Sequence, residues 1–290
     1  MTSSPVLGVI GGSGLYAISS LEDVETLDID TPFGKPSAPV VVGTMAGKRV
    51  AFLARHGVGH TITPTEVNYQ ANIYALKSLG IPQIVSISAC GSLREDYSPG
   101  QIVLPDQVFD FTRSGRKQSF FGEGLVGHIG TAIPYCEDLT ARVFQAVSQT
   151  GVVTHAGGVL ITVEGPRFST RAESNIFRSW GMSIIGMTAC PEVFLAREAE
   201  MCYVTMAHVT DYDVWRNTSE PVSVEMVIQT LNKNTEAAQK AIENLLSLLP
   251  ENRTCDCGSA LKDAIITNPG RIPSETRHKL RLLVDKYLPS

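Results

Sequence analysis

Residues 201–209 read MCYVTMAHV, and residues 210–213 follow them as TDYD. The apolar run predicts a central strand, and TDYD falls at the carboxyl end of that strand, where an open α/β sheet usually binds its ligand. On a continuing strand, residues i and i+2 point to the same face, so Asp211 and Asp213 would meet one ligand together. Two carboxylates can accept hydrogen bonds from an exocyclic amine, and one of them can protonate a ring nitrogen. An isolated Asp-x-Asp is nevertheless more often a polar turn that closes a strand.

The rest of the chain alternates apolar, β-branched runs with segments of helical period. Strands are expected at residues 6–10, 83–89, 102–105, 159–163 and 182–187, with a hairpin at 40–44 and 49–53. Capping boxes at 63–66 (TPTE) and 170–173 (TRAE) are expected to open helices, and further helices are expected at 223–249 and 274–287. The alternation predicts an α/β fold, with a twisted, mostly parallel or mixed central sheet flanked by helices.

The chain has 290 residues, of which 43% are hydrophobic, and can therefore bury one sizeable core. We expect a single main domain over residues 1–250. Apolar periodicity is lost over residues 252–267, before the final helix. Residues 251–290 are therefore expected to form a C-terminal appendage that carries a Cys-x-Cys and packs on the same domain.

Charge and hydropathy exclude several classes of partner. The formal net charge is −5 and the charged residues are well mixed, so there is no basic stripe for nucleic acid. The N-terminal residues lack the basic and apolar regions of a signal peptide, and no apolar run approaches the length of a membrane span. We expect a soluble, cytoplasmic protein that binds neither nucleic acid nor membrane.

The six cysteines are scattered along the sequence and form no paired CxxC knuckles, so a zinc ribbon is disfavoured. Cys90, Cys190 and Cys202 lie in apolar contexts, which is typical of small core residues. The Cys255-Asp256-Cys257 motif differs, because a lone CxC can be redox-active or join other sulfurs. The six histidines show no metal-binding spacing, and we expect no metal.

Two segments that follow strands are candidates for an anion site. Residues 12–17 (GSGLYA) satisfy the dinucleotide fingerprint, but no strand ending in an acid follows about twenty residues on. A cradle of backbone N–H groups with the Ser13 hydroxyl is the better functional interpretation, with a plain tight turn equally frequent. Arg55 and His56 end another strand, and an arginine there offers a planar, permanently charged fork suited to phosphate.

Further polar groups follow other predicted strands. Ser88 and Ala89 end one strand and Thr188 ends another, so hydroxyls and amides can converge on one oxyanion. Phe168 lies in a polar loop and is suited to stacking on a planar base, although a core position is about equally frequent for such a residue.

Seven ordered blocks identify a family. They are GGSGL (11–15), TPFGKPS (31–37), LARHGVGHTITPTEVNYQANIYALK (53–77), SACGSLRE (88–95), VEGPRFSTRAES (163–174), GMTACPEV (186–193) and TDYDVW (210–215). With these blocks the chain, over residues 6–249, resembles the trimeric purine nucleoside phosphorylases, and within them the 5′-methylthioadenosine phosphorylases. The resemblance implies a nucleoside phosphorylase fold and a homotrimer or a dimer of trimers.

The resemblance also implies roles for individual residues. Phosphate-binding positions are matched by Ser13, Arg55, His56, Ser88, Ala89 and Thr188. The purine is expected to be read by Asp211 and Asp213, with Phe168 against the base and Met187 against the ribose. A pocket for the 5′-methylthio group is matched by Val224, Val227 and Ile228, with Ser169 a further specificity position. His128 matches a residue donated to the neighbouring subunit's site.

These matches imply phosphorolysis of 5′-methylthioadenosine to adenine and 5-methylthioribose 1-phosphate, in purine and methionine salvage. Asp211 is the expected general acid at N7, and inorganic phosphate is a co-substrate, so no cofactor is expected. The alternative is a 6-oxopurine phosphorylase. It is disfavoured because an ionised Asp211 would oppose a carbonyl oxygen, at a cost of about 1–3 kcal/mol. An NAD-linked oxidoreductase and a non-catalytic nucleoside sensor fit the motifs less well.

Two features bear on how far this resemblance extends. Gly186 stands where eukaryotic members have Asn, which bears on base selectivity. A C-terminal CxC accompanies disulfides in thermostable members, and Cys136 and Cys202 are similar to positions that are paired there. A reducing cytosol argues against such bridges in this chain.

Overall fold

The computed structural model describes residues 4–12, 20–113, 115–216 and 224–288, with residues 224–234 given by their backbone alone. The strands are β1 (Leu7–Gly11), β2 (Glu22–Leu27), β3 (Val40–Met45), β4 (Lys48–Ala54), β5 (Gln83–Ser92), β6 (Ile102–Leu104), β7 (Gln107–Phe111), β8 (Thr154–Ala156), β9 (Val159–Val163), β10 (Ile184–Gly186) and β11 (Cys202–Asp211). The helices are α1 (Tyr69–Ser78), α2 (Glu137–Ser148), α3 (Arg171–Ser179), α4 (Ala189–Glu198), α5 (Val224–Leu248) and α6 (Ser274–Val284), with short 3₁₀ turns at Asp256–Ser259 and Pro269–Arg271.

One mixed sheet runs through the molecule in the order β2-β3-β4-β1-β5-β10-β9-β7, and β11, β6 and β8 branch from β5. The pairs of β5 with β1 and with β11 are parallel, whereas β5 and β10 pair antiparallel. The predicted α/β fold with a mostly parallel or mixed sheet is confirmed. Because β5 pairs with three strands, it lies at the branch point of the sheet, and its carboxyl end meets the ends of several other strands.

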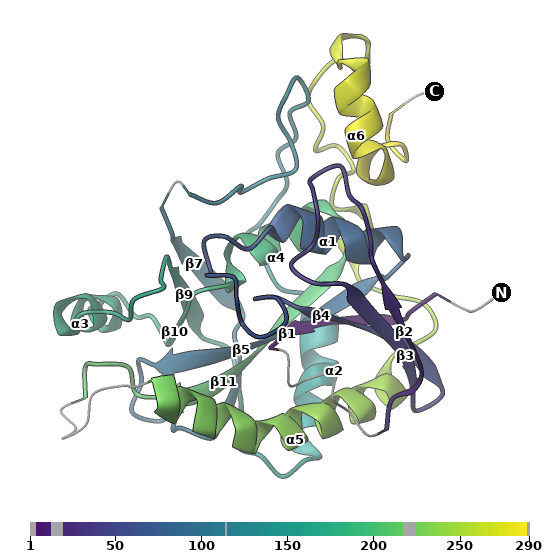
Figure 1. Cartoon of the computed structure of the whole chain (residues 1–290). Helices are drawn as coiled ribbons and strands as arrows, with labels where there is room; N and C mark the ends of the chain where they lie inside the picture. The colour runs from purple at the N-terminus through teal and green to yellow at the C-terminus, as the bar shows by residue number, and fades with distance from the viewer. Residues whose placement is uncertain (1–3, 13–19, 114, 217–223, 289–290) are drawn as a thin grey trace.

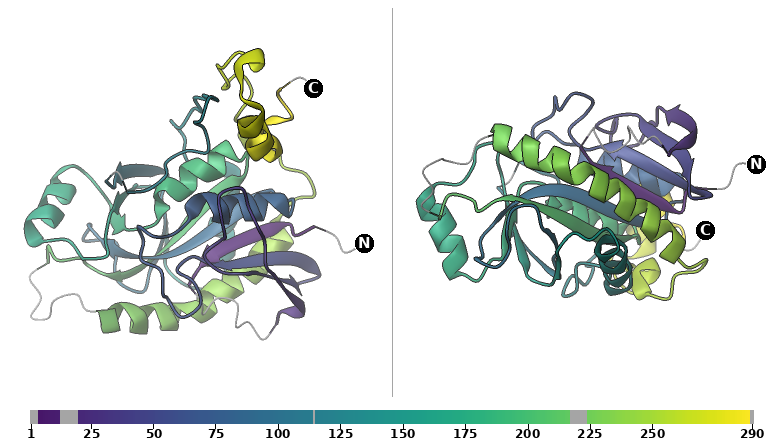
Figure 2. Two further views of the ribbon diagram at one scale, coloured as in Figure 1. Left: turned by 45° about the horizontal axis from the view of Figure 1, so that its top comes forward. Right: turned by 90° about the horizontal axis from the view of Figure 1, so that it is seen from below.

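Helices cover both faces of this sheet. Helices α1 and α4 lie on one face and α2 and α5 on the other, with α5 crossing the sheet in the view from below (Figures 1 and 2). The first apolar core joins α1 and α4 to the sheet, and the second joins α2 and α5 to it. The β11 residues between these layers are buried along the whole strand, as the apolar run 201–209 predicts.

Helix α3 begins as the sequence predicts. The Thr170 side chain accepts a hydrogen bond from the Glu173 backbone, and the Glu173 side chain accepts one from the Thr170 backbone. This reciprocal pair satisfies two of the N–H groups that the first turn of a helix leaves without partners.

The predicted start of α1 at Thr63 is wrong. Thr63 and Glu66 do hydrogen-bond to each other, but they close an isolated turn, and the helix begins at Tyr69 with Asn68 as its N-cap. The Asn68 side chain accepts from the Ala71 backbone N–H and donates to the Phe33 carbonyl at 2.7 Å. Asn is a favoured N-cap residue, so this helix start rests on local capping together with a contact to a distant loop.

The C-terminal segment packs against the first core. Leu261, Leu280 and Leu283 share that core with residues of α1 and α4. The segment also contacts the loop after β7, where the His128 backbone N–H donates to the Ala264 carbonyl and Thr276 donates to the Glu123 carbonyl. In Figure 1 this loop and α6 lie together at the top of the molecule.

Two further differences concern strand length and unpredicted elements. The strand expected at 182–187 is shorter, because Met187 leaves the sheet and Thr188 becomes the N-cap of α4. Helices α2 and α4 and strands β2, β7 and β8 were not among the predicted elements.

Within the described residues, no helix combines the length and the apolar character that crossing a membrane requires.

Candidate active site

Arg55 follows β4 and lies buried at the carboxyl end of β1, where its backbone N–H donates to the Gly11 carbonyl. Its guanidinium does not present an open fork. Nε and Nη2 donate to the two carboxylate oxygens of Glu192 at 2.8 and 2.9 Å. Nη1 donates to the Ser88 hydroxyl at 3.3 Å and is the part of the group that faces the other predicted phosphate residues. The prediction that the fork itself faces phosphate is therefore wrong in its geometry.

Glu192 is fully buried in the first turn of α4 and also accepts a hydrogen bond from the Tyr203 hydroxyl at 2.8 Å. Burial by itself lowers the pKa of Arg55, but the attraction of the facing Glu192 carboxylate outweighs it and raises that pKa. Arg55 therefore stays charged in a site with little water. Glu192 was not among the predicted site residues, although an acid within the apolar run TACPEVFLA was a usable signal.

Ser88 connects Arg55 to Thr188. The Ser88 hydroxyl lies 3.3 Å from the Thr188 hydroxyl and accepts from Arg55 Nη1. Thr188 makes no side-chain capping bond to α4, so its hydroxyl is directed to Ser88 instead. Ala89 follows Ser88 in β5, half-buried, and pairs with His208 of β11. Two hydroxyls and one charged guanidinium thus converge in the carboxyl half of β5, where they form a group suited to an oxyanion.

His56 lies beside this cluster. Its Nδ1 is 2.9 Å from the Ile62 carbonyl and must carry the proton there, and its ring stacks on His60. Burial, followed by the charge of Arg55, lowers the pKa of His56 to about 4, so the ring is neutral at pH 7. An anion bound at its Nε2 would favour protonation. Ser13 lies outside the described residues.

Asp211 ends β11, and a bulge determines where its side chain lies. Val209 pairs with Cys90 and Asp211 pairs with Gly91, so two residues of β11 oppose one of β5 and Thr210 is the extra residue. The Thr210 hydroxyl donates to Asp211 Oδ2 at 2.7 Å.

The first interpretation assumed that the strand continues to Asp213, but it ends at Asp211. Asp213 has a φ of 50°, and its backbone N–H donates to Asp211 Oδ1 at 2.7 Å, which makes the pair an Asx turn. The two carboxylates nevertheless lie together over Gly91. A Cβ at Gly91 would come within 3.1 Å of Asp211 Oδ1 and 3.2 Å of the Asp213 Cβ. The turn weighed from the sequence is therefore observed, and the shared ligand site stays a prediction that the proximity of the two carboxylates supports.

Burial is the main cause that raises the pKa of Asp211, against two hydrogen bonds that lower it. Burial also raises the pKa of Asp213, against the neighbouring Ser174 hydroxyl, which lowers it, and the Asp211 charge adds to the rise. Within the described part of the chain, Asp213 Oδ2 is buried and has no hydrogen-bond partner at normal distance. The pair therefore favours holding a proton, and one of its oxygens is available to a ligand.

Met187 and the loop after β9 are fixed by Arg116, a buried residue that was also absent from the predicted site. Arg116 Nη1 donates to the carbonyls of Met187 and Cys190 at 2.7 Å each, and Nη2 donates to the Glu164 carbonyl at 2.7 Å. A side chain at Gly165 would collide with the Met187 sulfur, so the loop packs directly on Met187.

The remaining predicted residues are less closely grouped. Phe168 is 39% exposed. Ser169 lines a cavity of about 130 Å³ together with Arg167 and Glu173, and Arg55 and Asp211 are not in that lining. Val224, Val227 and Ile228 lie in the first turns of α5, but their side chains are outside the described part. His128 is exposed on the loop beside the C-terminal segment.

Gly186 precedes Met187 and leaves room for Cys90. A Cβ at Gly186 would lie 3.2 Å from the Cys90 sulfur and 4.0 Å from Leu160. A larger residue at this position therefore requires Cys90 to shift.

Known proteins share this sequence and fold. The family model described as the phosphorylase superfamily matches residues 6–247. An S-methyl-5′-thioadenosine phosphorylase of Koribacter versatilis is 50% identical over 281 residues, which cover 97% of this chain and 96% of the relative. The chain belongs to the S-methyl-5′-thioadenosine phosphorylase family of the phosphorylase superfamily.

Two solved structures of the family agree with the fold. A methylthioadenosine phosphorylase from an antarctic soil metagenomic library has a TM-score of 0.93 and 42% identity, covering 98% of this chain and all (100%) of that one. A mutant of the adenosine/methylthioadenosine phosphorylase from Schistosoma mansoni, in complex with methylthioadenosine, has a TM-score of 0.82 and 36% identity, with coverage of 89% of this chain and 96% of that one. The family resemblance expected from the seven sequence blocks is confirmed.

Within the family fold, the described residues form two groups on β5. Arg55, Ser88 and Thr188 meet at Ser88, and Asp211 and Asp213 meet over Gly91. Gly91 lies three positions beyond Ser88 in β5, so the two groups lie about 10 Å apart along the strand.

Proposed function

We propose that this chain catalyses the phosphorolysis of 5′-methylthioadenosine to adenine and 5-methylthioribose 1-phosphate, as a pentosyltransferase of purine and methionine salvage. The names of its relatives and the ligand of the Schistosoma structure support this substrate. The single observation that carries the proposal is the common position of two groups on β5. A charged oxyanion cluster is anchored at Ser88, and a buried carboxyl pair lies over Gly91, three positions or about 10 Å further along the strand backbone. A nucleoside bound between them would present its ribose to one group and its purine to the other.

In the proposed reaction, a phosphate oxygen forms a bond to ribose C1′ while the C1′–N9 bond breaks. The electron pair of the broken bond goes to the purine, and Asp211 donates a proton to N7 to relieve that charge. Asp211 must be protonated to act in this way, and its raised pKa favours the protonated form. The phosphate dianion also stabilises the positive charge that develops on the sugar.

We assign phosphate binding to Arg55, Ser88 and Thr188, together with Ser13, His56 and the Ala89 backbone. Arg55 supports the anion through Ser88, because Nη1 donates to the Ser88 hydroxyl and the Ile87 carbonyl while Nε and Nη2 donate to Glu192. Inorganic phosphate is a co-substrate in this scheme, and the chemistry requires no cofactor.

We assign the nucleoside to Asp213 and Met187, with Phe168 against the base. Specificity for the 5′-methylthio group is assigned to Val224, Val227 and Ile228, with Ser169 at the edge of that pocket. The unpartnered Oδ2 of Asp213 is suited to accept from a 6-amino group.

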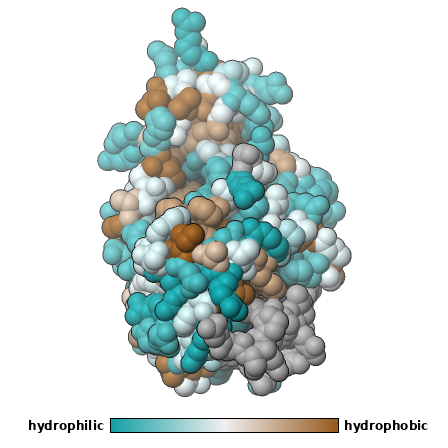
Figure 3. Space-filling view, turned by 90° about the vertical axis from the view of Figure 1, so that its left-hand side faces the viewer, coloured by the Kyte–Doolittle hydropathy of each residue, from teal (hydrophilic) through white to brown (hydrophobic). Residues whose placement is uncertain are grey.

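We propose that the active form is a homotrimer or a dimer of trimers, with His128 reaching the site of the neighbouring subunit. Its exposure on a loop away from the Asp pair supports this assignment. Exposed aromatic side chains of β7 and α3, Phe109, Phe111 and Trp180, form one cluster. The side of the molecule that bears α3 shows apolar surface between polar patches (Figure 3).

A cytoplasmic location and a main domain over 1–250 with an appendage over 251–290 remain our proposals.

The test compares 5′-methylthioadenosine, adenosine and inosine, each with and without phosphate. Phosphate-dependent release of adenine, fastest from 5′-methylthioadenosine, is the expected result. Adenine release without phosphate would identify a hydrolase. Faster turnover of inosine would favour the 6-oxopurine alternative.

A further inference from the structure

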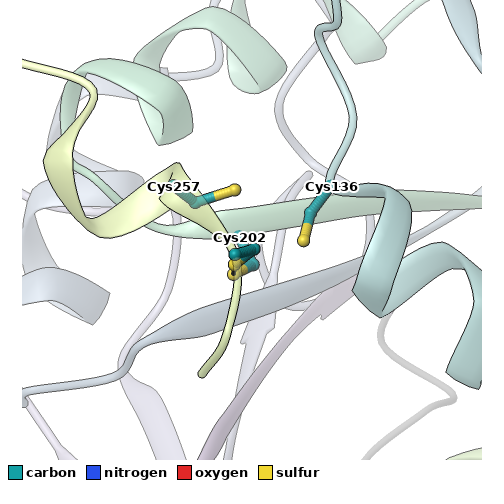
Figure 4. A group of neighbouring side chains, drawn as sticks. Cys136, Cys202 and Cys257 are labelled. Carbon is teal, nitrogen blue, oxygen red and sulfur yellow. Dashed lines mark hydrogen bonds between the residues drawn. The ribbon is translucent and has the colours of Figure 1, made fainter. Parts of the chain in front are cut away.

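Four cysteines that are scattered in the sequence meet in one cluster at the opposite end of β11 from Asp211. Cys136 is the N-cap of α2, Cys202 begins β11, and Cys255 and Cys257 come from the C-terminal segment. Their sulfurs all lie within 4.8 Å of one another. Figure 4 shows Cys136, Cys202 and Cys257 turned toward a common point. Asp211 is nine residues further along β11 than Cys202, so the cluster is about 30 Å from the Asp pair.

We propose that these four cysteines form a structural Zn²⁺ site. A zinc ion with four thiolate ligands at about 2.3 Å has sulfurs about 3.8 Å apart, at the corners of a tetrahedron. The closest recorded pair here, Cys202 and Cys255, is 3.3 Å apart, and no pair exceeds 4.8 Å. Shifts of about 1 Å or less would convert this arrangement into that tetrahedron.

The surroundings suit four thiolates rather than four thiols. A zinc ion with four thiolates carries a charge of about −2, which burial penalises unless cations are near. Arg253 donates to the Cys202 sulfur at 3.6 Å, and Arg197 donates to the Cys257 sulfur at 3.7 Å. The Leu139 backbone N–H also donates to the Cys136 sulfur at 3.5 Å. These are the outer contacts that orient ligands and offset charge in metal sites.

The size of the site selects a single ion. The four sulfurs lie within 4.8 Å of one another, which leaves room between them for one ion. Cys136, Cys202 and Cys257 are buried and Cys255 is half-buried, so a larger ligand has no access. Tetrahedral coordination by four sulfurs is typical of zinc or of iron–sulfur centres, and four protein ligands leave no open position for catalysis. The site therefore holds the C-terminal segment to α2 and β11.

The expectation of no metal rested in part on the absence of CxxC knuckles, and for a geometric reason that absence does not exclude this cluster. Two of the ligands lie in separate elements, and the other two are spaced i, i+2, because the 3₁₀ turn that begins at Asp256 turns both sulfurs inward. The spacing is shorter than in zinc knuckles, so sequence rules do not detect it.

The first experiment measures metal in the full chain, purified with a thiol reductant and without chelator. Mass spectrometry of the metal content is expected to find about one Zn²⁺ per chain. After chelation and removal of zinc, titration with Co²⁺ alone is expected to produce the thiolate-to-cobalt charge-transfer absorption of a tetrahedral sulfur site. This measurement uses the wild-type chain, so it does not depend on a variant that folds.

Cys257→Ser is expected to abolish stoichiometric zinc and the cobalt absorption. Cys190→Ser, which changes a buried cysteine outside the cluster, is expected to retain both. Two disulfides among the four cysteines that persist after purification with the thiol reductant, or substoichiometric zinc with four alkylatable thiols, would overturn the proposal. Iron in place of zinc would overturn the choice of metal. None of these readouts depends on nucleoside phosphorolysis.

Discussion

Glu192→Gln tests whether the fully buried Glu192 carboxylate stabilises the charged guanidinium of Arg55. Glu192 accepts three hydrogen bonds, from Arg55 Nε at 2.8 Å, from Arg55 Nη2 at 2.9 Å and from the Tyr203 hydroxyl at 2.8 Å. Two of these reach Oε1, so a glutamine with its carbonyl oxygen there keeps two of the three bonds. Its NH₂ group then faces the N–H of Arg55 Nε, and the guanidinium charge loses its counter-ion.

The expected loss of stability is large. Removing one partner of a buried ion pair typically costs about 3–5 kcal/mol, because the remaining charge stays buried. This is a large share of the usual stability of a folded protein, about 5–15 kcal/mol. Phosphate is expected to recover part of the loss, since its negative charge at Ser88 would attract the Arg55 guanidinium and its binding would stabilise the folded state.

Glu198→Gln is the matched control. Glu198 is buried on the same helix, but it accepts from the Ser119 hydroxyl and the Phe120 backbone N–H, and it has no cationic partner among those bonds. Burial raises the pKa of Glu198 to about 7, so at about pH 6 its carboxyl is mostly neutral and glutamine is a close substitute.

The assay is thermal and denaturant unfolding of wild type and both variants at one protein concentration and about pH 6, with and without phosphate. A cost of Glu192→Gln below about 1 kcal/mol, or no larger than that of the Glu198→Gln control, would refute the role given to the buried ion pair.

The other predictions concern rate, affinity and pH. Asp211→Asn is expected to lower kcat/KM for 5′-methylthioadenosine by about 10²–10⁴-fold, and to favour inosine relatively, because it removes the proposed proton donor; unchanged selectivity in parallel assays would exclude that role. Thr188→Val is expected to raise the KM for phosphate by about 10–150-fold, the value of one hydrogen bond to a charged group; an effect on kcat alone would contradict it. The contribution of Glu198 to stability is expected to fall as pH rises from about 4.5 to about 7, because its raised pKa lets the folded state bind a proton that the unfolded state releases, whereas the lowered pKa values of His56 and His208 act in the opposite direction. Glu198→Gln removes up to about 1.4 kcal/mol per pH unit of that fall, which unfolding midpoints across this range would reveal.

The sheet was largely predictable from sequence, because its central strands are buried on both faces and therefore appear as continuous apolar runs. β11 is buried along all its length, and its run was identified at once. The start of α1 was predicted wrongly, because the capping box at 63–66 competes with the N-cap Asn68, whose side chain also donates to the Phe33 carbonyl in a loop distant in sequence.

The candidate site likewise contains residues that the sequence predicted and residues that it did not. Arg55 and Asp211 follow strands, and the carboxyl ends of strands are where sequence patterns predict ligands. Glu192 and Arg116 lie elsewhere, and their positions follow from contacts across the fold, such as the 137 residues that separate Glu192 from Arg55. The four-cysteine cluster was missed for the same reason, since three chain segments must fold before it exists.

Because of the bulge at Thr210, the site depends on how many residues the end of β11 contains as well as on their types. Because β11 contributes two residues where β5 contributes one, the face that Asp211 occupies depends on one added position. If Thr210 instead paired with Gly91 in a regular ladder, Asp211 would shift by one register position, to the opposite face of the sheet. In a family alignment, this strand end should therefore tolerate exchange of side chains more readily than insertions or deletions.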